Sequence, residues 1–201
     1  FNECALEQIV LTCFARLGYE IAGGSEIASL SPGATGTASE QAVLVERCRE
    51  AVERINPHIS QEVREEAIRE VVRVHLPSLA DASRLFHCML RDGVKVERRR
   101  AGSTAGDYVQ LIDCGDPSNN SWLAVGRCTA FEGRHWGRAA VLVFVNGMPL
   151  GSVRFKSADD EPAGTGAPSH RIETHGRKIA SLIQRHVVTV AWDGVKADMG
   201  W

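Results

Sequence analysis

The spacing of apolar positions divides the sequence into a helical first part and a strand-rich second part. Between Glu3 and Leu17, apolar residues recur every three or four positions, which is the period of a helix with one buried face. Gly18 follows directly and predicts the end of that helix. The same period predicts three more helices, over 41–55, 60–74 and 77–90.

After Gly93 the apolar period changes to that of strands. Strands are predicted to start at Val94 and to cover 108–112, 122–131, 141–145, 150–155 and 186–192. The last of these is apolar without interruption, which is typical of an interior strand covered on both faces. A polar loop over 157–169 and a helix over 170–184 precede it, and a helix between strands favours an α/β fold. We expect a single domain over 1–201, with a helical subregion (1–92) and an α/β core (93–201).

Length and composition are those of a protein with a core of its own. The chain has 201 residues, of which 44% are hydrophobic. Its net charge of −2 excludes a polycationic nucleic-acid binder, so any such contact must come from a local basic patch. No apolar run approaches the ~18 residues of a membrane helix, and no charged-then-apolar leader is seen. We expect a cytoplasmic protein with no membrane partner.

Six cysteines are scattered along the sequence without a CxxC pair. Structural zinc sites need closely spaced ligand pairs, so zinc is not expected. Most of the cysteines fall in apolar periodic segments, where a free thiol behaves as a small hydrophobic group. Reduced thiols fit a cytosolic protein.

The most informative stretch covers 138–156 and consists of two apolar runs joined at Asn146-Gly147. Asn-Gly between apolar runs predicts a hairpin, because both residues tolerate the positive φ of a type I′ turn. The second run ends in Arg154-Phe155-Lys156.

This stretch closely resembles the nuclease motif in the N-terminal domain of the restriction (R) subunit of type I restriction enzymes. Five other segments resemble further sequence motifs of the family. They occur in the family's order and span nearly the whole chain: 2–19, 46–57, 85–94, 112–120 and 192–197. The resemblance implies a restriction-endonuclease-like mixed sheet flanked by helices, with the N-terminal helical region packed on it. In the family two motor domains follow; here there is no GxxxxGK[ST] loop, so we expect them to be absent.

The family's PD-(D/E)xK arrangement places two carboxylates and a lysine on the hairpin. The resemblance puts these at Ala140, Arg154 and Lys156, so only the lysine remains. Mg²⁺ takes oxygen ligands, which alanine lacks, and a guanidinium repels the metal. The family's Gln-x-x-x-Tyr pair is matched by Arg171 and His175. We therefore expect a degenerate site with no metal and no cofactor.

Relocated carboxylates would restore Mg²⁺-dependent cleavage. The candidates are Glu7, Glu132, Asp159, Asp160 and Glu173, each of which is also an ordinary surface or loop acid. Asp113 ends a strand, where it is interpreted as a turn cap rather than a metal ligand.

The remaining side chains predict a basic cluster that binds DNA phosphates: Arg138, Arg154, Lys156, Arg171 and Lys178. A pairing of Arg154 with Glu173 or a loop aspartate stays open. So does the choice between a solvated strand end and a DNA contact for Arg98-Arg99-Arg100.

The leading hypothesis is a DNA-associated, nuclease-derived domain whose cleavage is lost or strongly reduced. An active Mg²⁺-dependent endonuclease with relocated carboxylates is one alternative. A stand-alone protein-interaction module carried by a mobile element is the other, and protein partners or a homo-oligomer stay open.

Overall fold

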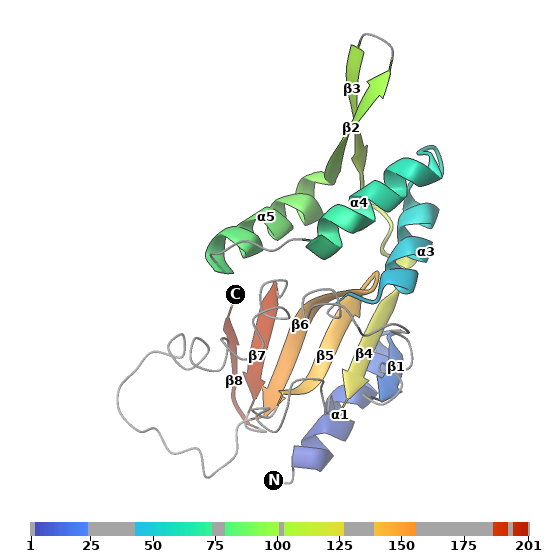
Figure 1. The fold of residues 1–201 in the computed structure, drawn as a ribbon. Coiled ribbons are helices and arrows are strands. Elements are labelled where there is room, and N and C mark those ends of the chain that lie inside the picture. The colour runs from blue at the N-terminus through green and yellow to red at the C-terminus, as the bar shows by residue number, and fades with distance from the viewer. Residues whose placement is uncertain are drawn as a thin grey trace. The chain divides into compact units, whose positions relative to one another are not determined.

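The computed structural model describes residues 3–23, 43–73, 79–100, 103–126, 139–155, 187–192 and 195–200. The chain forms two compact units (Figure 1). Unit 1 contains 1–32, 122–144 and 149–201, and unit 2 contains 33–121 and 145–148. That the two units form a single domain over 1–201 stays a prediction.

Unit 1 is built on a mixed sheet that has six strands in its described part, in the order β1-β4-β5-β6-β7-β8 (Figure 1). Their bounds are β1 (Glu20–Gly23), β4 (Trp122–Gly126), β5 (Ala139–Val145), β6 (Met148–Phe155), β7 (Val188–Trp192) and β8 (Ala197–Gly200). β1 pairs with β4 and β6 with β7 in parallel, whereas β7 and β8 are antiparallel. The expected α/β class with a mixed sheet is confirmed.

One helix, α1 (Glu3–Arg16), packs on this sheet. Its Leu6 and Leu11 share a buried cluster with residues of β4, β5 and β6. The helix ends as the sequence predicts, because Gly18 takes a φ of +88° that L side chains avoid. Tyr19 then packs 4.9 Å from Phe14 and 5.4 Å from Trp122 between ring centroids, which fixes the connection to β1.

Unit 2 holds three helices, a two-stranded ribbon and a short 3₁₀ turn among its described residues. The helices are α3 (Val45–Ile55), α4 (Gln61–Arg73) and α5 (Leu79–Asp92); the ribbon is β2 (Val94–Arg100) with β3 (Ser103–Val109), and the turn is η2 (Pro117–Asn119). Fully buried side chains such as Val52, Val71 and Phe86 form its core. The predictions of these helices are confirmed to within a few residues. None of the described helices is long and apolar enough to cross a membrane.

The strands differ from the prediction in three respects. The apolar pattern misses β1 and β8, because each has only four residues, too few for a period to be recognised. The strand expected at 108–112 is β3, which ends at Val109 and pairs back to β2. β7 is interior in the sheet order, as expected, but its five residues are half-buried rather than covered on both faces. The helix expected at 170–184 and the loop at 157–169 lie outside the described residues.

Candidate functional site

The β5–β6 hairpin, on which the resemblance places the nuclease positions, turns at Asn146 and Gly147. Their φ angles are +51° and +76°. Positive φ at both central residues is the signature of a type I′ turn, so the turn expected from Asn-Gly is confirmed.

The tip of this hairpin belongs to unit 2, where Asn146 is completely buried. Its Nδ2 donates to the carbonyl oxygen of Leu111 and to Oδ1 of Asn120, both at 2.8 Å. Its Oδ1 accepts from the amide N–H of Ser121 at 2.7 Å, and its own amide donates to the Ser121 carbonyl at 2.8 Å. Every polar atom of the side chain is therefore used, and the tip is held in one position.

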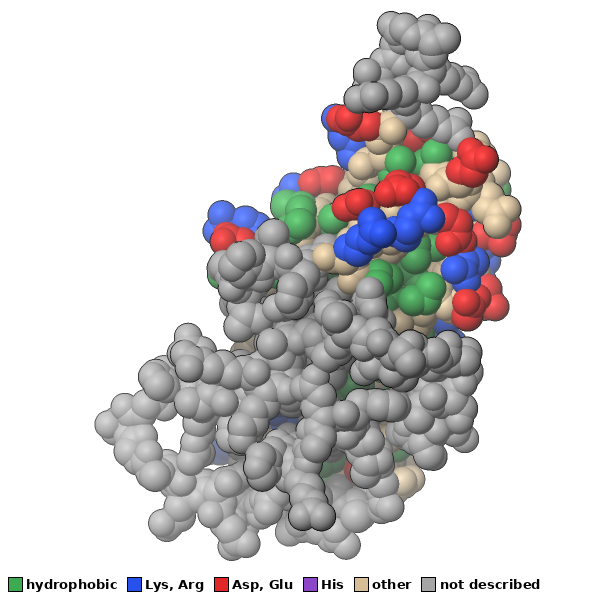
Figure 2. Space-filling model, in the orientation of Figure 1, with side chains coloured by type: hydrophobic (Ala, Val, Ile, Leu, Met, Phe, Trp, Pro, Cys, Tyr) green, Lys and Arg blue, Asp and Glu red, His purple; other side chains and the backbone are tan. Residues whose placement is uncertain are grey.

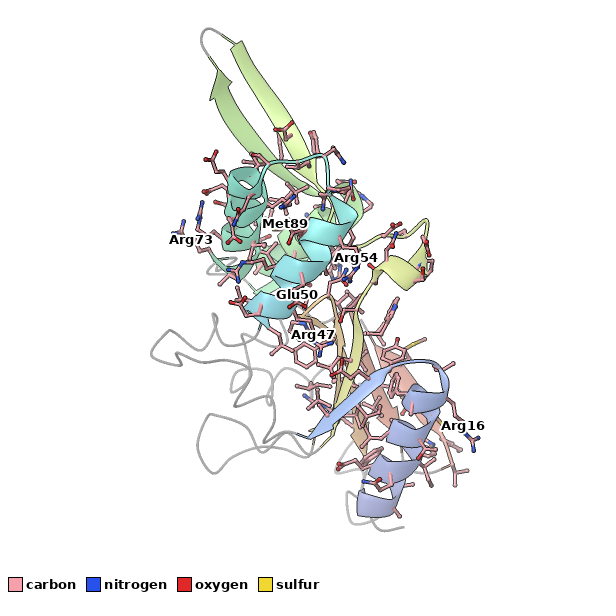
Figure 3. All side chains as sticks on the ribbon, turned by 90° about the vertical axis from the view of Figure 1, so that its right-hand side faces the viewer. Arg16, Arg47, Glu50, Arg54, Arg73 and Met89 are labelled. Atoms are coloured by element: carbon pink, nitrogen blue, oxygen red, sulfur yellow. The ribbon has the colours of Figure 1, made fainter. Side chains whose placement is uncertain are left out.

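Two arginines of α3 hold the segment that Asn146 binds. Arg47 donates to Oγ of Ser121 at 2.9 Å, and Arg54 donates to the carbonyl oxygen of Asn119 at 2.8 Å. Both arginines lie along α3 (Figure 3). Sequence reasoning treats Asn146 only as a turn residue and misses this network, although the pair Asn119-Asn120 is a signal for it.

Asp113 is a turn cap, as the sequence predicts. Its Oδ1 accepts from the amides of Gly115 and Asp116, each at 2.9 Å, and its Oδ2 accepts from Nδ2 of Asn119 at 2.9 Å. These donors hold the pKa of the Asp113 carboxyl below its usual value, with Asn119 contributing most. With its oxygens engaged in this way, Asp113 is part of the turn.

Of positions 140 and 154 on the hairpin, Arg154 lies on the face away from α1. Val141 and Val153 point into the cluster that α1 covers. Strand residues alternate between faces, so Arg154, which follows Val153 in β6, occupies the opposite face of the sheet.

The two positions also lie at the same level of the hairpin. A Cβ added to Gly151 would lie 3.6 Å from Cβ of Val143, so these residues are neighbours across β5 and β6. The strands are antiparallel, so three residues before Val143 lie opposite three residues after Gly151. These are positions 140 and 154. The fold therefore brings together the two positions where the resemblance expects carboxylates.

Arg154 is half-buried, and its Nε has no hydrogen-bond partner among the described residues. Burial lowers the pKa of the guanidinium. On the adjacent strand its register partner is Ala191, and the next residue on the same face is Thr189, so β7 offers no acid there. The cation is thus partly desolvated without a described counter-charge.

The other predicted site residues, Arg138, Lys156, Arg171, His175 and Lys178, lie outside the described residues. So do four of the candidate acids, Glu132, Asp159, Asp160 and Glu173. Their convergence, and a pairing of Arg154 with an acid of that group, stay predictions.

Glu7 is the described candidate among the relocated acids. It lies on α1 with 7% of its surface exposed. Its Oε1 lies against the end of β4, because a Cβ added to Gly126 would lie 2.7 Å from it. Within the described residues, however, no group of three or more His, Cys, Asp or Glu side chains could hold a metal ion.

The cysteines differ in environment more than the sequence suggests. Cys48 is buried, whereas Cys13, Cys88 and Cys114 are exposed, although most of the cysteines fall in apolar periodic segments. Burial raises the pKa of the Cys48 thiol to about 12, which keeps it protonated and unreactive.

Thiol labelling checks this difference. In the folded chain at about pH 8, we expect iodoacetamide to modify Cys13, Cys88 and Cys114 at least ~100-fold faster than Cys48, by peptide mass spectrometry. In strong denaturant all four should react alike. Equal rates in the folded chain would contradict the buried position of Cys48.

Comparison with known proteins places this geometry in a family. The family described as type I restriction enzyme R protein N terminus matches residues 1–169. The chain is 27% identical over 201 residues to the type I restriction enzyme HindI endonuclease subunit of Haemophilus influenzae, covering 99% of this chain and 19% of that protein. It is also 27% identical over 203 residues to the putative type I restriction enzyme MjaIXP endonuclease subunit of Methanocaldococcus jannaschii, with the same coverage. The chain thus spans about a fifth of the length of these relatives.

Proposed function

Because this chain belongs to the family of the type I restriction enzyme R protein N terminus, we propose that it is a DNA-associated domain that has lost, or nearly lost, metal-dependent cleavage. The relatives' names describe endonuclease subunits. Cleavage by this chain would need carboxylates beside Lys156 to hold Mg²⁺. Its place of action would be the cytoplasm, where it would meet DNA.

The observation that carries the proposal is the partly desolvated cation at position 154. A divalent ion about 6 Å from a guanidinium is destabilised by roughly 5 kcal/mol at an effective dielectric constant of about 20. Position 140 at the same level of the hairpin supplies no oxygen ligand, since it is alanine. With alanine at position 140 and arginine at position 154, the site would lack both acidic metal ligands and would carry one additional positive charge.

An arginine in place of a carboxylate favours the binding of a phosphate group. A guanidinium presents a planar set of donors that matches phosphate oxygens, and partial burial strengthens the attraction. The cluster that the sequence predicts around it, Arg138, Lys156, Arg171 and Lys178, would add to the local positive charge that the overall net charge of −2 does not provide.

An active nuclease is the second candidate, favoured by Glu7. This buried carboxylate lies against the end of β4, the strand next to β5 in the sheet. It would need a second acid from the residues that the structure does not describe.

The cleavage test uses supercoiled plasmid with Mg²⁺ or Mn²⁺. We expect no nicking above the no-protein control by the unaltered chain. Metal-dependent nicking that disappears in Lys156→Ala and in Glu7→Gln would replace this proposal with the active-nuclease alternative.

The binding test uses fluorescence anisotropy with a duplex of about 30 base pairs in EDTA, from about 50 to 200 mM salt. We expect salt-sensitive binding, and Arg154→Met should reduce the slope of log K against log salt by about 1. Arg16→Met, at an exposed arginine of the same unit, is the matched control and should leave the slope unchanged. An absence of binding at low salt would contradict the proposal that this chain associates with DNA.

A further inference from the structure

The face of the unit 1 sheet that carries Arg154 continues onto the neighbouring strand, β7 (Figure 1). Ser152 and Thr189 are register partners across β6 and β7, and Oγ of Ser152 donates to Oγ1 of Thr189 at 3.4 Å, so both hydroxyls lie on the same face. Arg154 follows Ser152 by two residues and therefore shares that face. A guanidinium and two hydroxyls thus occupy neighbouring positions on two adjacent parallel strands.

Two donor groups on this face have no acceptor among the described residues. Arg154 makes no hydrogen bond or ion pair there, although its Nε is buried. Thr189 accepts from Ser152, which directs its own hydroxyl proton elsewhere, and no described residue accepts that proton. Buried or half-buried donors are normally paired, and a guanidinium can only donate. The face is therefore matched to a group that supplies several acceptor oxygens.

Arginines on the helices of unit 2 have counter-charges of their own. Their ion pairs are Arg49 with Glu46 and Glu65, Arg64 with Glu53, Arg69 with Glu66, and Arg91 with Asp92. Basic and acidic side chains accordingly lie next to one another over the visible surface of these helices (Figure 2). Arg154 differs from them, because it is half-buried and its register partner on β7 is Ala191, which has no charge.

We propose that Arg154 and Thr189 together hold one phosphate group, supplied by DNA, with the guanidinium coming from β6 and the hydroxyl from β7. The inference rests on the DNA association proposed above and adds a second residue to the same site, on a strand outside the hairpin. Arginine and threonine are both common donors to phosphate oxygens in protein–DNA complexes. The oxygens of a phosphate point in several directions, so one group can accept from both strands.

The test is a double-mutant cycle in the 201-residue chain, with the duplex and salt range described above. Thr189→Val removes the hydroxyl with little change in shape, and Thr189→Ser keeps the hydroxyl. Thr12→Val is the matched control, at an exposed threonine of unit 1 whose hydroxyl donates to the carbonyl oxygen of Gln8. Circular dichroism checks that each variant is folded.

We expect Thr189→Val to weaken DNA binding about tenfold at each salt concentration. The slope of log K against log salt should not change, because a hydroxyl releases no counterion. Thr189→Ser and Thr12→Val should each stay within about twofold of the unaltered chain.

The cycle tests whether both side chains hold the same phosphate. In a chain that already carries Arg154→Met, Thr189→Val should cost less than about threefold, because the shared phosphate is already lost. The same loss with and without Arg154, or a loss in Thr12→Val as large as that in Thr189→Val, would overturn the inference.

Inorganic phosphate separates this inference from DNA association. We expect phosphate to raise the thermal unfolding midpoint above that in chloride of equal ionic strength, and Thr189→Val to remove the rise. If no DNA binds but phosphate still protects through Thr189, the phosphate site stands and DNA association fails. If DNA binds and Thr189→Val behaves like Thr12→Val, DNA association stands and the inference is overturned. A lower midpoint in Arg154→Met would then indicate that the guanidinium pairs with an acid of the chain itself.

Discussion

Replacing Gly147 with alanine is expected to cost at least ~4 kcal/mol of the free energy of unfolding, which is a large fraction of the stability of a typical domain. A Cβ at this position would run into the carbonyl oxygen of Leu44 and lie 2.9 Å from the amide nitrogen of Cys48. Both are backbone atoms at the start of α3, so neither can move without shifting the helix. The Gly147 carbonyl also accepts the amide of Leu44 at 2.8 Å, a bond that the shift would break.

Gly18→Ala is the matched control for this prediction. Gly18 also has a positive φ, +88°, but a Cβ there would meet nothing within 4 Å. Backbone strain alone should therefore cost about 1–2 kcal/mol. Urea unfolding followed by circular dichroism measures both variants. Similar costs for the two would mean that the close approach of the hairpin tip to α3 does not hold in solution.

Asn146→Ala is expected to destabilise the chain by about 3–7 kcal/mol. The substitution leaves the buried carbonyl of Leu111 and the amide of Ser121 without their side-chain partner, at about 1–3 kcal/mol each. It also places alanine at a φ of +51°, which costs about 1 kcal/mol more.

Asn119→Ala provides the comparison. Its side chain is half-buried and donates to Asp113, so its removal should cost about 1 kcal/mol. The same urea titration distinguishes the two asparagines. A cost for Asn146→Ala no larger than that of Asn119→Ala would show that the buried network contributes little.

Local signals in the sequence account for much of the fold. Asn146-Gly147 defines its turn because the two residues tolerate positive φ, whatever surrounds them. The four described helices follow from apolar periods that hold along a single segment. β1 and β8 could not be predicted in this way, since strands of four residues are specified by the neighbours with which they pair.

The candidate site, like the fold, can be predicted from the sequence only in part. The residue types at 140, 154 and 156, and with them the expectation of a damaged metal site, come from the sequence and its resemblance to the family. Only the tertiary structure decides that 140 and 154 lie at the same level of the hairpin, that Nε of Arg154 is enclosed, and that Glu7 lies against Gly126. Each of these depends on residues far apart in the chain. Desolvation, burial and cross-strand neighbours are properties of the packed chain, and no local window of sequence contains them.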